Sequence, residues 1–252
     1  MKRILFSAVK KVGKYLKEMF YNREGIEKVE MKNNGDFSIK ADLIAEEIYL
    51  SEFSNLDVKI ITEEKGTIGN ENDILIIDPL DGTINFHLGI PIFCTQIAFL
   101  SQQNISIIYL PITKELFFSI NKKSFLNKKE IKVSEKNDLN KAIIDFGTKA
   151  IIDEKLISLK CLFRRCFASA GISLAYTASS KIDASIMKNC FIWDYMPGKI
   201  LVENAGGKFL EFNGEYHFDF EKKNLIAGNK NIVKKIIEHV NNKNKTKKLE
   251  KS

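Results

Sequence analysis

Residues 74–86 read Ile74-Leu75-Ile76-Ile77-Asp78-Pro79-Leu80-Asp81-Gly82-Thr83-Ile84-Asn85-Phe86. The first four residues form an apolar run, as expected for a strand buried on both faces. Two carboxylates follow it, and Pro79 cannot extend the hydrogen-bond ladder, so we expect a turn there. Gly82 permits a tight backbone and the close approach of a ligand. Asp78 and Asp81 are close enough to repel each other unless a cation or a proton lies between them.

Taken alone, this stretch is also typical of an ordinary β-turn, in which Asp, Pro and Gly are common. Three other acidic positions bear on the choice. Glu63-Glu64 follows a predicted strand, and Asp42 and Asp194 begin predicted helices as candidate N-caps. Each of them alone is more simply a solvated strand end or a helix cap. Together they lie where α/β active sites are built, and ligand sets made only of oxygen suit magnesium.

The rest of the chain alternates between helical and extended patterns, which predicts a layered mixture of helices and sheets. At the N-terminus, apolar residues recur every four positions and predict a helix with one buried face: Ile4, Ala8, Val12, Leu16 and Phe20. The predicted helices are 4–20, about 42–53, 169–178 with Ser169 as cap, 194–206 with Pro197 in its first turn, and 232–240. The predicted strands are 58–62, 74–77, 93–100, 105–110, 115–120, 142–146 and 184–187, followed by strand and turn over 208–227.

Composition limits the class of protein. The 252 residues suffice for one large domain or two tightly packed halves, and 44% are hydrophobic, as in a globular protein. No stretch reaches the roughly 20 apolar residues of a membrane helix, so no membrane partner is expected. The three histidines lack zinc-ligand spacing. The four cysteines lack a C-x-x-C pair and have apolar neighbours, which predicts buried thiols in a reducing, cytoplasmic setting: Cys94, Cys161, Cys166 and Cys190.

The net charge of +7 does not by itself indicate nucleic-acid binding. The last twelve residues contain five lysines and one glutamate, so they contribute +4 of the net charge of +7. Such a segment is typical of a solvated, disordered tail, and we expect one over residues 241–252. No RNA- or DNA-binding motif accompanies it, so no specific nucleic-acid partner is expected.

The order of the motifs resembles that of the inositol monophosphatase family. It runs from Asp42 through Ile61-Thr62-Glu63-Glu64 and residues 78–86 to Trp193-Asp194-Tyr195-Met196-Pro197-Gly198 and Glu203-Asn204-Ala205-Gly206-Gly207. The resemblance covers about residues 4–240. It implies an α/β (α+β) fold, a layered α/β/α/β/α sandwich of the inositol monophosphatase and fructose bisphosphatase type. Residues 1–240 would form a single domain with two packed halves, about 1–140 and 141–240.

The resemblance further implies a lithium-sensitive phosphatase that uses two or three Mg²⁺ ions and works as a homodimer. Glu63, Asp78 and the carbonyl of Leu80 would hold one ion. Asp78, Asp81 and Asp194 would hold another, and a weaker third ion would lie near Glu63. The expected substrate is a small phosphorylated metabolite, hydrolysed by metal-activated water without a covalent phosphoenzyme.

Roles in catalysis and substrate binding follow from the same resemblance. Asp42 and the Thr83 hydroxyl would orient the attacking water, with Glu63 as a third catalytic residue. The backbone N–H groups of Gly82 and Thr83 would cradle the phosphate, and Asp81 and Asp194 would also face the substrate.

The substrate stays open between several classes. The Asn85-Phe86 ending resembles that of family members acting on inositol and sugar phosphates, which favours a polyol or sugar phosphate. Met187 and Lys188 stand where inositol-specific members place an acidic residue; Lys188 either favours a second anionic group or is a surface lysine. A phosphoadenosine phosphate nucleotidase and a fructose bisphosphatase are alternatives within the family. A non-catalytic binding protein is the alternative of another class, and the loss of a metal ligand would be its signature.

Overall fold

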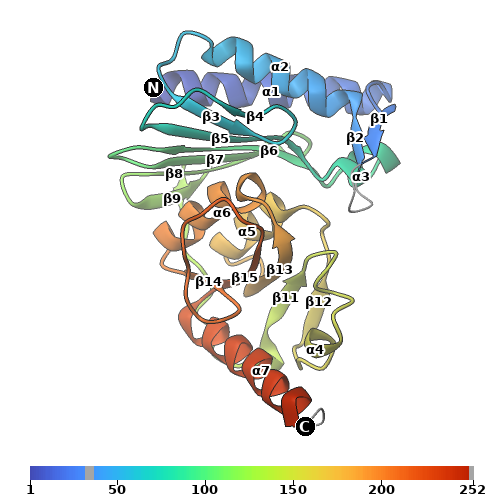
Figure 1. Cartoon of the computed structure of the whole chain (residues 1–252), viewed down its shortest axis with the longest axis vertical. Coiled ribbons are helices and arrows are strands. Elements are labelled where there is room, and N and C mark those ends of the chain that lie inside the picture. The colour runs from blue at the N-terminus through green and yellow to red at the C-terminus, as the bar shows by residue number, and fades with distance from the viewer. Residues whose placement is uncertain (32–36, 250–252) are drawn as a thin grey trace.

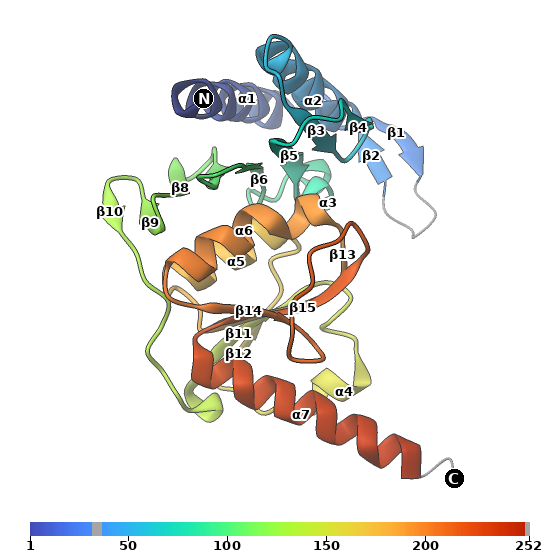
Figure 2. The same cartoon turned by 60° about the vertical axis from the view of Figure 1, so that its left-hand side comes forward.

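The computed structural model describes residues 1–31 and 37–249 of the chain. Its elements form five layers, α/β/α/β/α (Figure 1). Helices α1 (Lys2–Asn22) and α2 (Lys40–Phe53) cover the outer face of an eight-stranded sheet. Helices α5 (Ala170–Ala178) and α6 (Ile192–Asn204) separate this sheet from a five-stranded one (Figure 2). Helices α4 (Glu154–Ile157) and α7 (Lys230–Leu249) cover the far face of the smaller sheet.

The large sheet has the strand order β10-β9-β8-β7-β6-β5-β3-β4, and the small sheet has the order β12-β11-β13-β15-β14. A separate pair joins β1 (Lys28–Met31) and β2 (Phe37–Ile39), and α3 (Thr83–Leu88) follows β5. The large sheet contains β3 (Lys59–Thr62), β4 (Gly66–Ile68), β5 (Ile74–Asp81), β6 (Cys94–Leu100), β7 (Ile105–Leu110), β8 (Glu115–Ile120), β9 (Lys123–Leu126) and β10 (Lys129–Glu130). The small sheet contains β11 (Ile143–Phe146), β12 (Phe163–Arg165), β13 (Ala184–Cys190), β14 (Lys208–Glu211) and β15 (Lys223–Gly228).

Three apolar cores hold the layers together. One lies between α1, α2 and the large sheet, and another lies beneath α4 and α7. The middle core joins residues of both sheets, such as Ile76 of β5 and Leu225 of β15, to Leu174 of α5 and Leu201 of α6. Because buried apolar surface stabilises the fold in proportion to its area, this shared core fixes the two sheets relative to each other.

Most predicted elements are present, with shifted ends. The buried face of α1 passes through Leu5 and Val9, whereas Ile4 is exposed, so the expected place of Ile4 in the stripe is wrong. Helix α7 runs past the expected end at Val240 because no glycine or proline interrupts it, and extending an existing helix is easier than starting one. It takes in residues 241–249 of the expected disordered tail; residues 250–252 lie outside the described residues.

The cysteines differ from the expectation of four buried thiols. Cys94 is buried, Cys161 and Cys190 are half-buried, and Cys166 is exposed. The apolar neighbours of Cys166 in the sequence did not predict this, because it follows the edge strand β12, where only one side of the backbone is covered by a partner strand.

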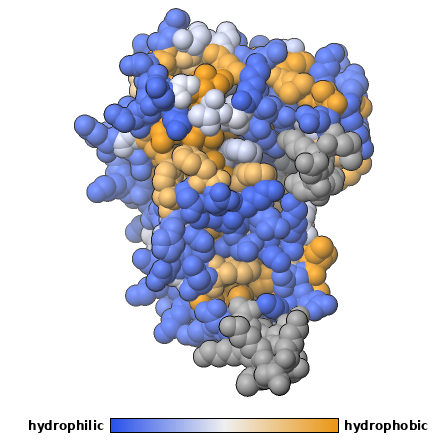
Figure 3. All heavy atoms as spheres, in the orientation of Figure 1, coloured by the Kyte–Doolittle hydropathy of each residue, from blue (hydrophilic) through white to orange (hydrophobic). Residues whose placement is uncertain are grey.

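On the face drawn in Figure 3, apolar and hydrophilic patches alternate. Within the described part of the chain, no helix combines the length and apolar composition required to cross a bilayer.

Candidate active site

A bulge in β5 brings the two aspartates of the central motif to one face of the large sheet. Asp78 pairs with Gln96 of β6, and Asp81 pairs with Cys94, so three steps on β5 match two on β6. In a regular strand, residues three apart point to opposite faces. Gln96 and Cys94 are two apart and share a face, so their partners share it too. The turn expected at Pro79 is therefore wrong: the strand continues to Asp81, and Pro79, which has no N–H, sits in the bulge.

The backbone after the bulge is tight, as predicted. Gly82 has φ 97°, and a Cβ on it would lie 2.9 Å from the carbonyl oxygen of Ile92. Thr83 then starts α3. Its hydroxyl oxygen lies 3.1 Å from Oδ1 of Asp42 and 3.1 Å from the carbonyl oxygen of Leu80. This hydroxyl thus connects Gly82 and Thr83, whose N–H groups are predicted to bind the phosphate, to Asp42, which is predicted to orient the attacking water.

Asp42 and Asp194 occupy equivalent positions in their helices. Each is the third helical residue and accepts a hydrogen bond at 2.7 Å from the N–H of the cap residue, Ile39 and Phe191 respectively. Their expected positions as N-caps are therefore wrong by three residues. An apolar cap side chain cannot accept a hydrogen bond, so the aspartate reaches back to the cap N–H. Pro197 correspondingly lies beyond the first turn of α6.

The turn that carries Glu63 rests on a carboxylate that the sequence analysis missed. Glu46 of α2 is fully buried, and its Oε1 accepts from the Thr62 hydroxyl at 2.7 Å and the Glu64 N–H at 3.1 Å. The available signal was helical spacing: Asp42, Glu46, Tyr49 and Phe53 share the buried face of α2. Glu46 therefore ties the predicted water-orienting helix to the predicted metal-binding turn.

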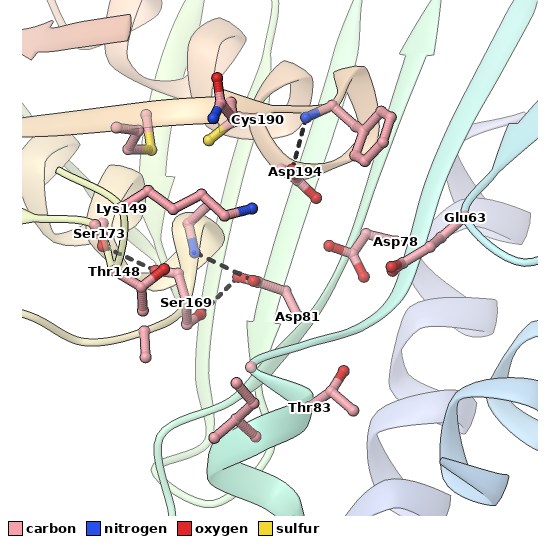
Figure 4. Close-up of a pocket in the computed structure, with 18 of the residues that line it drawn as sticks. Glu63, Asp78, Asp81, Thr83, Thr148, Lys149, Ser169, Ser173, Cys190 and Asp194 are labelled. Atoms are coloured by element: carbon pink, nitrogen blue, oxygen red, sulfur yellow. Dashed lines mark hydrogen bonds between the residues drawn. The ribbon is translucent and has the colours of Figure 1, made fainter. Parts of the chain in front are cut away.

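A pocket of about 200 Å³ lies beside these groups (Figure 4), and Asp42 and Glu46 are not among its lining residues. In that view the carboxylates of Glu63 and Asp78 face each other, and Lys149 extends toward Asp194. Among the residues lining the pocket are all the predicted metal and phosphate ligands: Glu63, Asp78, Leu80, Asp81, Gly82, Thr83 and Asp194.

The second half of the chain provides the opposite wall, which the sequence analysis largely missed. Oδ2 of Asp81 accepts from the Ser169 hydroxyl at 2.6 Å and from the Gly171 N–H at 2.6 Å. Ser169 was predicted only as the cap of α5, a role it also fills by accepting from the N–H of Ile172. Lys149 and Lys188 line the same wall. Lys188 is half-buried and donates to Asp153 at 2.5 Å.

The carboxylates of the pocket are electrostatically unfavourable together. Burial raises the pKa of Asp78 well above its ordinary value, and the negative charges of Asp81, Glu63 and Asp194 raise it further. Burial likewise raises the pKa of Asp194 well above its ordinary value, and the charge of Glu63 adds to this. Burial also raises the pKa of Asp42. Such a cluster is stabilised by a bound proton or by a cation.

The ligand set fits a hard cation in its chemistry. Oδ1 of Asp78 is buried without a hydrogen-bond partner, which is costly unless a cation or water contacts it. Yet in the described part of the chain, no three acidic, histidine or cysteine side chains already close around one point. Asp81 and Asp194 instead accept backbone N–H groups of Gly171 and Phe191. Each carboxylate keeps lone pairs beyond these hydrogen bonds with which it can bind a cation.

Comparison with known proteins identifies the family whose fold this chain shares. The model of the inositol monophosphatase family matches residues 1–245. The chain belongs to this family. The five layers are those of the inositol monophosphatase fold, as expected from the sequence.

Individual relatives span nearly the whole chain. The Nus factor SuhB of Haemophilus influenzae is 30% identical over 257 residues, which cover 95% of each chain. The crystal structure of the extragenic suppressor protein suhB from Bartonella henselae has 30% identity and a TM-score of 0.86, covering 95% of this chain and 97% of that one. The MJ0109 gene product, an inositol monophosphatase–fructose 1,6-bisphosphatase, has 26% identity and a TM-score of 0.84, with coverages of 95% and 99%.

Proposed function

We propose that this chain is a magnesium-dependent phosphatase that hydrolyses a small polyol or sugar phosphate. The observation that carries the proposal is the bulge of β5, which brings Asp78 and Asp81 to one face and leaves Oδ1 of Asp78 buried without a partner. Glu63 and Asp194 line the same pocket. Four carboxylates around one small pocket suit two divalent cations and a phosphate group.

The residues that would hold the ions are those expected from the family resemblance. Glu63, Asp78 and the Leu80 carbonyl would hold one Mg²⁺; Asp78, Asp81 and Asp194 would hold the other. Bound Mg²⁺ would lower the pKa of a water molecule and neutralise the negative charge of the phosphate.

The protein groups around them would position the reactants. The N–H groups of Gly82 and Thr83 would donate to phosphate oxygens, where charge builds up during the reaction. The Thr83 hydroxyl donates to Asp42, so its oxygen can accept a hydrogen bond from the attacking water. The water proton would pass to this oxygen as the Thr83 proton passes to Asp42, whose pKa is raised by burial and therefore closer to that of a useful base.

Pocket size and lining favour a small substrate. A volume of about 200 Å³ is less than that of pockets for drug-sized ligands, which hold roughly 300–1,000 Å³. Two aromatic rings line the pocket, Phe37 and Phe191. Phe191 already stacks on Trp193 and has the Lys222 ammonium 4.2 Å from its centroid, and the Lys28 ammonium lies 4.3 Å from the centroid of Phe37. Both rings are therefore poorly placed to stack on an adenine, which argues against phosphoadenosine phosphate.

A sugar bisphosphate is the second candidate. Met187 is buried at the pocket wall and offers no acidic group to inositol hydroxyls, whereas Lys149 and Lys188 bring positive charge to the same wall. A second phosphate would compete with Asp153, which already accepts from Lys188, for the positive charge of this wall. The printed name of one structural relative, inositol monophosphatase–fructose 1,6-bisphosphatase, is in keeping with this alternative.

A non-catalytic role is the candidate of another class. Relatives at 30% identity carry the name Nus factor SuhB, and this name does not refer to hydrolysis. The presence of all four acidic residues favours catalysis, because a protein that only bound a partner would not need them. A binding role in addition to catalysis is compatible with the same site.

The experiment that tests the proposal is phosphate release by the purified chain with Mg²⁺. The panel contains inositol monophosphate, glycerol phosphate, fructose 1,6-bisphosphate and phosphoadenosine phosphate. We expect hydrolysis of a polyol or sugar phosphate that stops in excess chelator and is inhibited by lithium. No release from any member would contradict catalysis, and a preference of about tenfold or more for phosphoadenosine phosphate, roughly 1.4 kcal/mol in the transition state, would contradict the substrate class.

A further inference from the structure

A buried amide links the two halves of the candidate active site. Gln96 of β6 is fully buried and pairs directly with Asp78 across the large sheet. Its Nε2 lies 3.2 Å from Oδ2 of Asp78. The same nitrogen lies 3.2 Å from the carbonyl oxygen of Trp193 and 3.1 Å from that of Asp194, in the first turn of α6. All three neighbours are acceptors, so the NH₂ group must face them.

One of these carbonyls is available because of a proline. In an α-helix the carbonyl of residue 193 accepts from the N–H of residue 197. Residue 197 is proline, which has no N–H, and it lies inside α6. The Trp193 carbonyl would thus be left without its helical partner in the middle core, and Gln96 donates to it from β6 of the large sheet. A carbonyl satisfied in this way avoids the cost of a buried, unpaired acceptor.

The neighbouring helix leaves space for this amide. A Cβ at Gly171 in α5 would lie 2.7 Å from Oε1 of Gln96 and 2.9 Å from Oδ2 of Asp81. A larger residue at Gly171 would therefore push the amide and the Asp81 carboxylate out of place.

We propose that Gln96 is a positioning residue that joins the Asp78 carboxylate to the first turn of α6 and so sets the separation of Asp78 and Asp194. Pro197 adds to the link by leaving the Trp193 carbonyl to Gln96, and the contact of Gln96 with the Asp194 carbonyl does not depend on the proline. The inference rests on the proposed function, because these two aspartates come from different halves of the chain and are both proposed Mg²⁺ ligands. Groups that orient metal ligands typically contribute about 10–100-fold to metal affinity.

The test uses Gln96→Met, which keeps the length of the side chain and removes its hydrogen bonds. Thermal unfolding is followed during titration with MgCl₂, together with the Mg²⁺ dependence of phosphate release. We expect Gln96→Met to raise the Mg²⁺ concentration for half-maximal effect by about tenfold or more in both assays. Gln96→Glu, which presents a carboxylate to three acceptors, should be worse, and Gln96→Asn is too short to rescue.

Thr95→Val is the matched control, since Thr95 is buried in the same strand and bonds Tyr49 at 2.6 Å, in the core under α2. It should lower Tm and leave the Mg²⁺ half-point unchanged. Equal Mg²⁺ half-points for wild type and Gln96→Met would overturn the proposal, and so would a shift in Thr95→Val as large as that in Gln96→Met.

Pro197→Ala separates the two parts of the link, because it returns an N–H to the Trp193 carbonyl. In that background Gln96→Met should lower Tm by less than half of its effect in the wild type, while the shift in Mg²⁺ half-point persists. Additive effects on Tm would overturn the role of Pro197. If the wild-type chain neither binds Mg²⁺ nor releases phosphate, the proposed function fails. In that case the link is tested only by whether the effects of Gln96→Met and Pro197→Ala on Tm are non-additive.

Discussion

The hydroxyl of Thr83 donates a hydrogen bond to Asp42, a residue 41 positions earlier in the chain, at 3.1 Å. This contact joins the start of α3, where the phosphate is expected, to α2, where the proposed base lies. A single hydroxyl group thus lies next to both the proposed phosphate site and the proposed base.

Replacing Thr83 tests this relationship. Thr83→Val keeps the shape of the side chain and removes the hydroxyl, so we expect kcat to fall by about 10²-fold or more with a small change in KM. Thr83→Ser retains the hydroxyl and should keep most of the activity. Steady-state phosphate release on the best substrate of the panel measures both. A Thr83→Val enzyme with more than a third of wild-type kcat would exclude the hydroxyl from the reaction.

Asp81→Asn should reduce turnover to below about a tenth of the wild-type rate, because a neutral amide is a poor ligand for Mg²⁺. The asparagine also turns an NH₂ group toward donors, since Asp81 accepts from the N–H groups of Ala170 and Gly171. We therefore expect a loss of stability of about 1–3 kcal/mol as well. Asp73→Asn is the control, because Asp73 is exposed just before β5. Turnover of Asp81→Asn close to that of the control would remove Asp81 from the ligand set.

Mg²⁺ should raise Tm. An ion that binds only the folded state adds about 2.7 kcal/mol at a hundredfold excess over Kd, and for a chain of this size each kcal/mol is about 2–4 °C. Relief of repulsion among Asp78, Asp81 and Asp194 is the physical source. Differential scanning fluorimetry with MgCl₂, against NaCl of equal ionic strength, measures the shift. Identical curves in the two salts would mean that the carboxylates are neutralised by protons alone.

Asp145 of β11 should make stability depend on pH between about 4 and 6. Burial raises its pKa from 3.8 to about 6, although the Ser173 hydroxyl and the Phe167 N–H donate to it. The folded state thus binds a proton more tightly than the unfolded state. This group's stabilising contribution is fully present below about pH 4 and is lost as pH rises through 6, a change of about 3 kcal/mol.

Asp145→Asn mimics the protonated form, because its amide can donate to Ser173 while Ser173 donates to the Ser169 carbonyl. The free energy of unfolding in urea should therefore match wild type near pH 4 and exceed it above pH 6. The exposed Asp57→Asn is the control. A constant difference between Asp145→Asn and wild type across this range would contradict the raised pKa.

Ala168→Gly should stabilise the protein. Ala168 lines the pocket with φ 53°, a left-handed conformation that costs a side chain about 1–2 kcal/mol. Glycine relieves this strain, but it also makes the unfolded chain more flexible, which offsets part of the stabilisation. We therefore expect the free energy of unfolding to rise by about 0.5–1 kcal/mol. Ala175→Gly, inside α5, should instead destabilise by about 1 kcal/mol. Urea unfolding at pH 7 measures both, and a destabilised Ala168→Gly would show that its Cβ packs usefully against the pocket.

Much of this protein was readable from local sequence. Apolar runs predicted β3, β6 and β7 because strands buried on both faces need continuous apolar residues. Ser169 predicted the start of α5 because a cap acts within three residues of itself. The family motifs named Glu63, Asp78, Asp81 and Asp194, and the fold lines one pocket with all of them.

What only the tertiary structure decided depends on contacts between distant segments. The sequence of β5 alone suggests a turn at Pro79, and only pairing with β6 reveals the bulge that turns Asp78 and Asp81 to one face. Ser169 reaches Asp81 across 88 positions, and Gln96 reaches Trp193 across 97. Helix and strand periodicity report which side of an element is buried, but not which element covers it. Chemical identity of the site is therefore a local property of the sequence, whereas its geometry arises from the packing of the two sheets around α5 and α6.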